Sequence, residues 1–293
     1  MIQFLLSGIA TGSMYALLAM SLTIVFRVSK VLNFAHGDLM TVSAFAFYTF
    51  VALWHWPVAV ALVPAVLAAV LVAAATDRLA VRPVWKRGGF GPHNHNWILS
   101  TFGVSLLIQA TCQLVWGNFE LNAPSVVPDG LIKIGDAGIT TQELAIIGFA
   151  LVAVVAVDTL NERTTWGKAT EAVAENPVVA GLMSINSPRV IGITWLLSGA
   201  IVGLAGILVA PTLILGSTMG FFIAIKAFVV VVIGGLGSVR GTIVAGYAVG
   251  LIEYALSQQL SGGYVDVVVL GGLIAVLAMK PAGLFGRGEV VRA

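Results

Sequence analysis

Two short polar stretches interrupt a largely apolar sequence, and both carry residue types that could do chemistry. The first is NFAHGDLM, residues 33–40, which places Asn33, His36 and Asp38 within six residues. One histidine and one aspartate without a second cluster do not make a metal site, so we predict none. Two compatible roles stay open. One is a helix cap at the membrane face, with Asp38 near the helix N-terminus. The other is that these residues, together with Gly37, line a transport path.

The second stretch is VVVVIGGLGSVRG, residues 229–241. Its start is similar to a dinucleotide-binding turn, but Arg240 stands where the third glycine of G-x-G-x-x-G belongs, and another apolar segment follows. We therefore predict a glycine-rich break between two membrane helices. Irregular backbone at membrane depth must be buried in protein or line a cavity, so Gly235, Gly237 and Ser238 become further candidates for the path.

The motifs of the common enzyme classes are missing from the sequence. It has no H-E-x-x-H and no G-x-S-x-G, so we predict no catalytic residues and a protein that is not an enzyme. It also has no G-x-x-x-x-G-K-[ST], so any ATP hydrolysis must come from another subunit.

The composition sets the class of protein that holds these stretches. The chain has 293 residues, of which 59% are hydrophobic and 10% charged, and its mean hydropathy is +1.01. Soluble domains carry about 25% charged residues. The sequence therefore predicts a polytopic membrane protein. A net charge of +2 gives no reason to expect a nucleic-acid partner.

Long apolar segments without strand-like alternation favour helices over a barrel. We predict an all-α membrane protein with about eight to nine transmembrane helices, because a span needs about 20 apolar residues. The expected segments are 2–26, 38–54, 57–79, 97–116, 142–160, 190–215, 220–234, 241–258 and 264–280. The short segments 38–54 and 220–234 are candidates for broken or re-entrant helices.

Charge orients these segments. Most Lys and Arg residues fall on the loops of one side, which the positive-inside rule places in the cytoplasm. The N-terminus is then outside, the C-terminus is cytoplasmic, and residues 117–141 face outward. Inside the spans, Lys226 and Glu253 are candidates for an ion pair.

Glycine pairs four residues apart occur inside several spans, at Gly8 and Gly12, Gly199 and Gly203, and Gly246 and Gly250. We interpret them as helix-packing contacts. The pattern L-S-G-x3-G occurs at residues 6–12 and again at 197–203, in segments expected to run in opposite directions. An inverted repeat is a possible consequence.

A third stretch, EAVAENPVVAGLMSIN at residues 171–186, predicts a small amphipathic helix on the cytoplasmic side. Asn176 suits the N-cap and Pro177 the first turn. Val178, Leu182 and Ile185 share a face, Gly181 permits close approach, and Asn186 and Pro188 end the helix. Glu175 adds negative charge near its start. About ten residues are too few for a stable isolated helix, and without a Lys/Arg-rich face a soluble partner is favoured over the lipid surface.

Four blocks together carry a resemblance to a known family. They are SGIATGSMYALLAMSLTIVF, VLNFAHGDLM, GKATEAVAENPVVAGLMSINSPRV and VVIGGLGSVRGTIVAGYAVGLIE, in that order along the whole chain. The chain resembles the permeases of bacterial ABC importers, most closely the branched-chain amino-acid (LivH-type) permease family. One departure is that the family tends to carry Arg where Glu171 stands, which puts the local salt bridges in question.

The resemblance implies a single permease domain, 1–293, with a cytoplasmic coupling loop at 161–189 that inserts into a groove of an ATPase subunit. It implies as partners a second related permease in a heterodimer, two ABC ATPase subunits, a periplasmic binding protein and the lipid of the bacterial inner membrane. The chain itself then holds no cofactor, since ATP and Mg²⁺ belong to the ATPases. The coupling residues would be Glu171, Glu175, Asn176, Pro177, Val178, Gly181 and Leu182.

The expected cargo is a branched-chain amino acid or a related small amino-acid, amide or organic-acid solute. The alternative is a secondary transporter or channel without an ATPase, against which the scarcity of carboxylates inside the spans counts.

Overall fold

The computed structural model describes residues 2–88, 96–128, 130–134, 137–260, 262–280 and 283–286. Helices dominate the described chain. They are α1 (Ile2–Ser29), α2 (His36–Tyr48), α3 (Val58–Ala75), α4 (Arg82–Gly88), α5 (Asn96–Trp116), α6 (Thr141–Arg163), α7 (Thr165–Glu175), α8 (Pro177–Leu182), α9 (Ser187–Val209), α10 (Met219–Gly234), α11 (Val239–Ser257) and α12 (Gly262–Met279). π-helical segments Thr49–Leu53 and Thr76–Val81 extend α2 and α3, and a 3-10 turn, Ala210–Thr212, follows α9.

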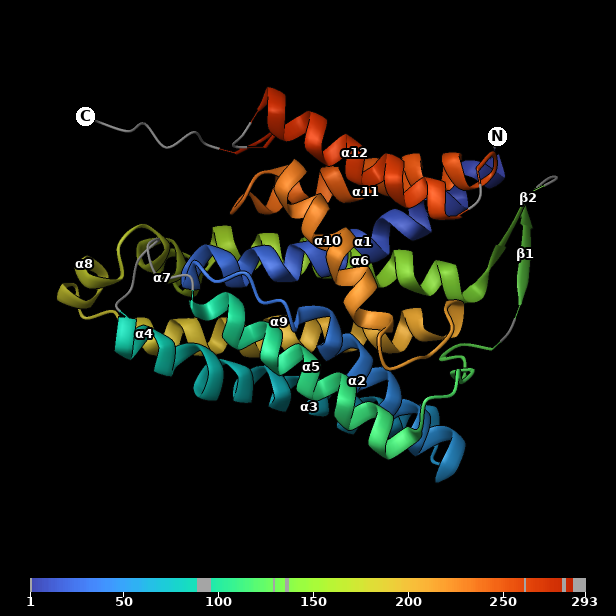
Figure 1. The fold of residues 1–293 in the computed structure, drawn as a ribbon, viewed down its shortest axis with the longest axis horizontal. Coiled ribbons are helices and arrows are strands. Elements are labelled where there is room, and N and C mark those ends of the chain that lie inside the picture. Colours follow the sequence, from blue (N-terminus) through green and yellow to red (C-terminus); the bar gives the residue numbers. More distant parts are fainter. Residues whose placement is uncertain are drawn as a thin grey trace.

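Six of the described helices are long and apolar enough to cross a membrane, and α10 and residues 263–279 of α12 form shorter apolar helices. The chain is thus a multi-pass helical membrane protein. Each of the nine predicted segments overlaps one helix of the structure. Most of the long helices run beside one another along the long axis of the molecule, and α10 crosses between them (Figure 1).

The two ends of the bundle differ. Helices α7 and α8 lie at one end, here called the α8 end. Strands β1 (Leu131–Ile134) and β2 (Ala137–Thr140) form an antiparallel hairpin at the other, the hairpin end (Figure 1). This hairpin was not predicted. It leads into α6 through a capping box, in which the Glu143 backbone N–H donates to the Thr140 hydroxyl oxygen over 3.1 Å.

The most buried spans are α1 and α9, and each packs closely on one other helix. Helix α1 contacts α11, and α9 contacts α3. A Cβ at Gly12 would lie 2.9 Å from the Cα of Tyr247, and one at Gly203 would lie 2.9 Å from the Cβ of Ala69. The predicted role of these glycines in helix packing is confirmed, since a larger residue would push the helices apart.

Helices α2 and α10 begin inside the bundle. After α1 the chain turns back at Lys30, whose φ is +55°, and enters the bundle before α2 starts (Figure 1). The starts of the two helices touch, because a Cβ at Gly37 would lie 1.9 Å from the carbonyl oxygen of Gly220. The Gly220 N–H also donates to the Thr41 hydroxyl over 2.9 Å. The starts of α2 and α10 therefore meet in the interior of the protein.

Candidate functional site

The polar stretch 33–38 lies in this interior. Asn33, His36 and Asp38 have relative exposures of 3%, 2% and 0%. Asn33 stabilises the turn before α2, where its Oδ1 accepts from the Ala35 N–H over 3.1 Å. The cap of α2 is Ala35 and has no side-chain hydrogen bond to the helix. Asp38 does lie in the first turn, as predicted, but it does not cap the helix.

Asp38 instead joins α2 to α5. Its Oδ2 accepts from the Ser105 hydroxyl, and its Oδ1 accepts from the Gln109 amide over 3.2 Å. Gln109 also donates to Ser105 over 3.0 Å, which closes a buried network of three residues. A buried carboxylate held by two neutral donors keeps its hydrogen bonds without an ion pair. Sequence reasoning missed Ser105 and Gln109, although their spacing of four residues places them on one helical face.

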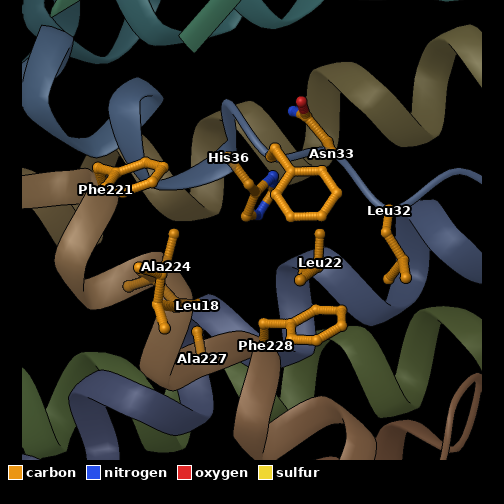
Figure 2. Close-up of a pocket in the computed structure, with 11 residues that line it drawn as sticks. Leu18, Leu22, Leu32, Asn33, His36, Phe221, Ala224, Ala227 and Phe228 are labelled. Atoms are coloured by element: carbon orange, nitrogen blue, oxygen red, sulfur yellow. The ribbon is translucent and has the colours of Figure 1, made fainter. Parts of the chain in front are cut away.

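His36 points into an apolar cavity, the His36 cavity, of about 170 Å³ (Figure 2). The cavity lies between α1, the loop before α2, and α10, and its lining residues are Leu18, Leu22, Leu32, Asn33, Phe34, His36, Phe221, Ala224, Ile225, Ala227 and Phe228. The Ser21 hydroxyl lies 2.7 Å from His36 Nε2 and donates its own proton to the Leu18 carbonyl over 2.7 Å.

This geometry is consistent with one tautomer of a neutral His36. With the Ser21 hydroxyl donating to Leu18, the Ser21 oxygen accepts from Nε2–H and Nδ1 carries the lone pair. Nδ1 has no hydrogen-bond partner among the described residues. The His36 cavity therefore has mainly apolar walls, which suit a small and mostly apolar group.

The second predicted break is a tight turn between α10 and α11. Gly235 and Gly237 have φ of +95° and +88°, which only glycine adopts without strain. A Cβ at Gly235 would lie 2.3 Å from the backbone N of Gly286, so the C-terminal segment covers the turn closely. Ser238 caps α11, since its hydroxyl accepts from the Gly241 N–H over 3.2 Å.

The structure does not bring the two breaks into one cavity. Gly237 and Ser238 line a charged cavity of about 870 Å³ at the α8 end, together with Glu171 and Glu175 of α7. None of the described lining residues of the His36 cavity belongs to this set. That both breaks line one transport path stays a prediction. If they do, they line it at different depths.

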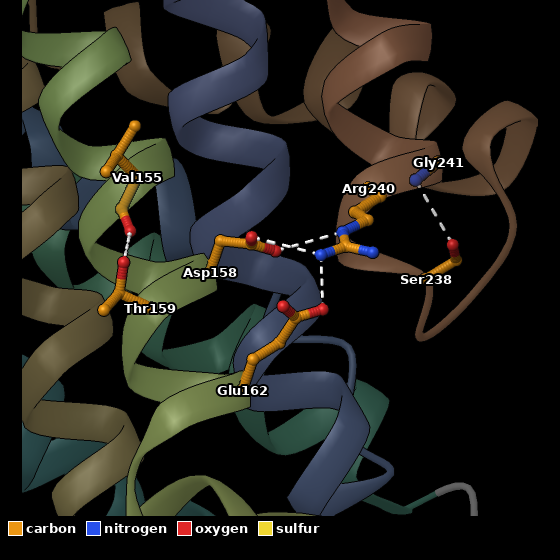
Figure 3. A network of polar contacts seen from close by, with 7 residues as sticks. All are labelled: Val155, Asp158, Thr159, Glu162, Ser238, Arg240 and Gly241. Atoms are coloured by element: carbon orange, nitrogen blue, oxygen red, sulfur yellow. Dashed lines mark hydrogen bonds and ion pairs between the residues drawn. The ribbon is translucent and has the colours of Figure 1, made fainter.

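An ion-pair network fastens the second break to α6 (Figure 3). The Arg240 guanidinium donates to both oxygens of Asp158 over 3.1 Å each, and also to Glu162. Asp158 and Glu162 are four residues apart, on one face of α6. Sequence reasoning used Arg240 as the residue that breaks the glycine motif and as a positive charge, and did not predict this contact. The end of α6, which continues into α7, is thereby joined to the start of α11.

The predicted coupling helix is present as α8, capped as expected. Asn176 Oδ1 accepts from the Val178 and Val179 N–H groups over 3.0 and 3.1 Å, and Pro177 follows in the first turn. The helix is shorter than predicted and ends at Leu182, because Ser184 turns the chain with φ of +65°.

The predicted face of Val178, Leu182 and Ile185 is therefore not continuous. Ile185 packs against a buried apolar cluster that includes Val173 and Val190, while Val178 and Leu182 are 71% and 83% exposed. The prediction that Asn186 ends this helix is also wrong. Asn186 caps α9 instead, accepting from the Arg189 N–H over 3.1 Å.

Helix α7, which was not predicted as a separate helix, supports α8. It buries Gly167, Thr170 and Val173 and exposes Glu171 and Glu175. Glu171 lies 3.5 Å from Arg27 at the end of α1, so its carboxylate has an ion-pair partner within this chain. Most predicted coupling residues are exposed, with Pro177 half-buried.

An ion pair predicted between Lys226 and Glu253 is confirmed, with 2.6 Å between Lys226 Nζ and Glu253 Oε1. Asp266 of α12 bonds the same ammonium over 2.9 Å and was not foreseen. Within the described ranges, no group of three or more His, Cys, Asp or Glu side chains could hold a metal ion.

Comparisons with known proteins point in one direction. A family described as "Branched-chain amino acid transport system / permease component" matches residues 4–278. The high-affinity branched-chain amino acid transport system permease protein LivH of Escherichia coli (strain K12) is 30% identical over 304 residues, covering 99% of this chain and 96% of that protein. BraD of Pseudomonas aeruginosa, described in the same words, is 29% identical over 302 residues, covering 99% and 97%.

A solved structure supports the fold. PsaBC from Streptococcus pneumoniae in complex with Fab aligns with a TM-score of 0.51 over 93% of this chain and 90% of that chain, at 9% sequence identity. An identity this low carries an argument about the fold alone.

Proposed function

Because the chain belongs to the branched-chain amino acid transport system permease family, we propose that it is the membrane-spanning subunit of an ATP-driven importer of branched-chain amino acids or related small solutes. A permease component is not an enzyme. The proposed assembly contains a second related permease, two ATPase subunits that bind ATP and Mg²⁺, and a periplasmic binding protein. This chain contributes one permease domain, residues 1–293, and holds no cofactor.

The observation that carries this proposal is the surface of α8. Val178, Val179, Leu182 and Met183 are 50% to 83% exposed and form an apolar tip at the α8 end. At Gly181, nothing described lies within 4 Å of the position that a Cβ would take. An apolar tip on a short, capped helix fits a groove on a soluble partner. We propose that this groove belongs to an ATPase subunit. The coupling loop that enters it comprises residues 161–189.

Movement of α8 has a physical route into the membrane helices. Helix α8 packs on α7, which follows α6 after a single residue, Thr164. The Arg240 network joins α6 to the Gly235–Ser238 turn. We propose that closure of the ATPases tilts α7 and α8, and that this motion reaches α11 through Arg240. The turn would then gate the cytoplasmic part of the path, and Asn33, His36, Gly37 and Asp38 would line its middle.

We propose that the described helices include nine membrane-entering segments, of which α2 and α10 are partial and begin at depth. An inverted repeat accounts for this pair. Helices α1, α2 and α3 would correspond to α9, α10 and α11. In support, Gly37 and Gly220 are each the second residue of their helices and touch each other. The packing of the helices follows the same symmetry. Helix α1 packs on α11, and their counterparts α9 and α3 pack on each other.

We place the protein in the bacterial cytoplasmic membrane, with its N-terminus outside and its C-terminus in the cytoplasm. Basic residues gather at the α8 end. Arg27, Lys30, Lys168 and Arg240 line the cavity there, and Arg82 and Arg189 line a neighbouring one. The positive-inside rule then makes the α8 end cytoplasmic and the hairpin end periplasmic.

Affinity purification tests the assembly. The chain would be tagged at its C-terminus, expressed with its neighbouring genes and purified in mild detergent. We expect a second permease and P-loop ATPases in stoichiometric amounts, and loss of the ATPases alone when Leu182→Asp places a charge on the apolar tip. A homo-oligomer without an ATPase would contradict the proposal and favour a secondary transporter or channel.

A further inference from the structure

A second cavity, at the hairpin end, has a different chemistry from the His36 cavity. This hairpin-end cavity has a volume of about 620 Å³ and lies between α1, the start of α6, the turn after α9, α10 and α11. Its polar and charged lining residues include Tyr15, Gln142, Glu143, Lys226 and Glu253. Within the orientation proposed above, it faces the side from which a binding protein would deliver cargo.

The charges of this cavity do not balance. Among the described lining residues, Glu143 and Glu253 stand against a single cation, Lys226. Lys226 is also bonded by Asp266 over 2.9 Å, and Asp266 is not among the described lining residues. One ammonium group is thus shared between two carboxylates, which leaves surplus negative charge beside the cavity. Ionised groups inside a membrane protein are costly and mark functional positions, and a cleft lined by one sign of charge attracts the opposite sign.

Two acceptor atoms in the lining are unused. The Glu253 carboxylate bonds Lys226 through Oε1 and also interacts with the Tyr15 hydroxyl, while its Oε2 is buried without a hydrogen-bond partner among the described residues. Gln142 is 6% exposed and donates its amide to the Leu208 carbonyl, and its Oε1 also has no partner there. A buried acceptor without a donor is destabilising, so both atoms suit a ligand that brings N–H donors.

Helix α10 separates the hairpin-end cavity from the His36 cavity. Phe222, Ile223 and Lys226 face the first, whereas Phe221, Ile225 and Phe228 face the second. The two sets occupy neighbouring faces of one helix. Two cavities of different chemistry, the polar hairpin-end cavity and the apolar His36 cavity, thus lie on either side of α10. This arrangement suits a cargo that has one charged end and one apolar end.

We infer that the hairpin-end cavity binds the ammonium group of an α-amino-acid substrate, with Glu253 as its main partner and Gln142 as a second acceptor. This inference rests on the proposed transport function and narrows its cargo. An ammonium group supplies the three N–H donors and the positive charge that the lining lacks. An organic acid brings only negative charge, and an amide or urea brings no charge.

Uptake measurements test the role of Glu253 in the complete transporter. Glu253→Gln keeps the shape and leaves Lys226 paired with Asp266. We expect leucine uptake per assembled complex to fall by about tenfold or more, since a hydrogen bond to a charged group is typically worth that factor. Glu253→Asp should recover part of it. Glu120→Gln removes an exposed carboxylate that is not among the described lining residues of the cavity, and is the matched control.

The outcomes separate the two proposals. If the wild-type complex shows no ATP-dependent uptake of any branched-chain amino acid or related small solute, the proposed function fails. If it takes up only an amide or an organic acid, the proposed function stands and the inference about the ammonium site is overturned. If the wild type transports leucine and Glu253→Gln transports it equally well, the inference about the ammonium site is overturned and the ion pair has only a structural role.

A labelling experiment decides the question even if Glu253→Gln does not assemble. Met14 lines the cavity and is half-buried, and Met14→Cys in a Cys112→Ser background places one thiol there. We expect a cationic methanethiosulfonate to react about tenfold faster than an anionic one, from a local potential of a few kT. Leucine should slow the reaction, and 4-methylpentanoate, which lacks the ammonium group, should not. Equal rates and equal protection would refute the inference.

Discussion

The contact between Gly37 and Gly220 supports a worked prediction. In Gly37→Ala, the new Cβ would lie 1.9 Å from the carbonyl oxygen and 2.6 Å from the carbonyl carbon of Gly220. Even close carbon–oxygen contacts in proteins are about 3.3 Å or longer. The starts of α2 and α10 must therefore separate by more than about 1 Å.

This separation has two energetic consequences. Overpacking a close contact costs about 1–3 kcal/mol. Moving the helices apart also breaks the bond from the Gly220 N–H to the Thr41 hydroxyl, now 2.9 Å long, and a buried N–H without an acceptor costs a further ~1–3 kcal/mol. The expected loss of stability is about 2–6 kcal/mol, and the residues at the middle of the proposed path shift with the helix.

The assay is the thermal unfolding midpoint of the purified complex, measured beside leucine uptake. Gly103→Ala in α5 is the matched control, because nothing described lies within 4 Å of a Cβ there. Alanine is favoured over glycine inside a helix by roughly 0.5–1 kcal/mol, so the control should be unchanged or slightly more stable. If Gly37→Ala unfolds at the same temperature as Gly103→Ala and transports normally, the two helices do not meet at Gly37.

Three further predictions concern α8, the Arg240 network and the Asp38 network. Gly181→Trp on α8 should leave the protein folded and ATP hydrolysis active but reduce uptake, whereas Gly148→Trp, also without described neighbours within 4 Å of its Cβ position, should not; normal uptake in the first variant would exclude α8 as the docking element. Arg240→Gln removes the link to its two carboxylates and should lower the uptake per ATP hydrolysed with little change in unfolding midpoint, because exposed ion pairs contribute little stability; an unchanged ratio would argue against this route. Asp38→Leu leaves Ser105 without its buried acceptor and should destabilise by about 1–3 kcal/mol, whereas Asp38→Asn keeps an acceptor oxygen and should be milder; equal midpoints for the two would contradict the network.

The amino-acid sequence alone determined those features that depend on neighbouring residues. The membrane class and the nine apolar segments follow from composition and length, since a helix that spans a bilayer must be apolar over about 20 residues. The cap at Asn176 and Pro177 was also predictable, because capping involves residues within one turn. The pairing of Lys226 with Glu253 was predictable for another reason. Charges inside a membrane need partners, and few were available.

Only the tertiary structure decided how the segments meet. Nothing local shows that Asp38 binds Ser105 and Gln109, that Arg240 binds α6, or that Gly37 touches Gly220. The lengths of α8 and of the coupling face depended on a turn at Ser184 and on the burial of Ile185 against distant residues. The placement of the two breaks in separate cavities also depended on contacts between helices far apart in the chain. Periodicity and caps are set by bonds within a few residues, whereas cavities and buried polar networks are set by packing between helices far apart in the chain.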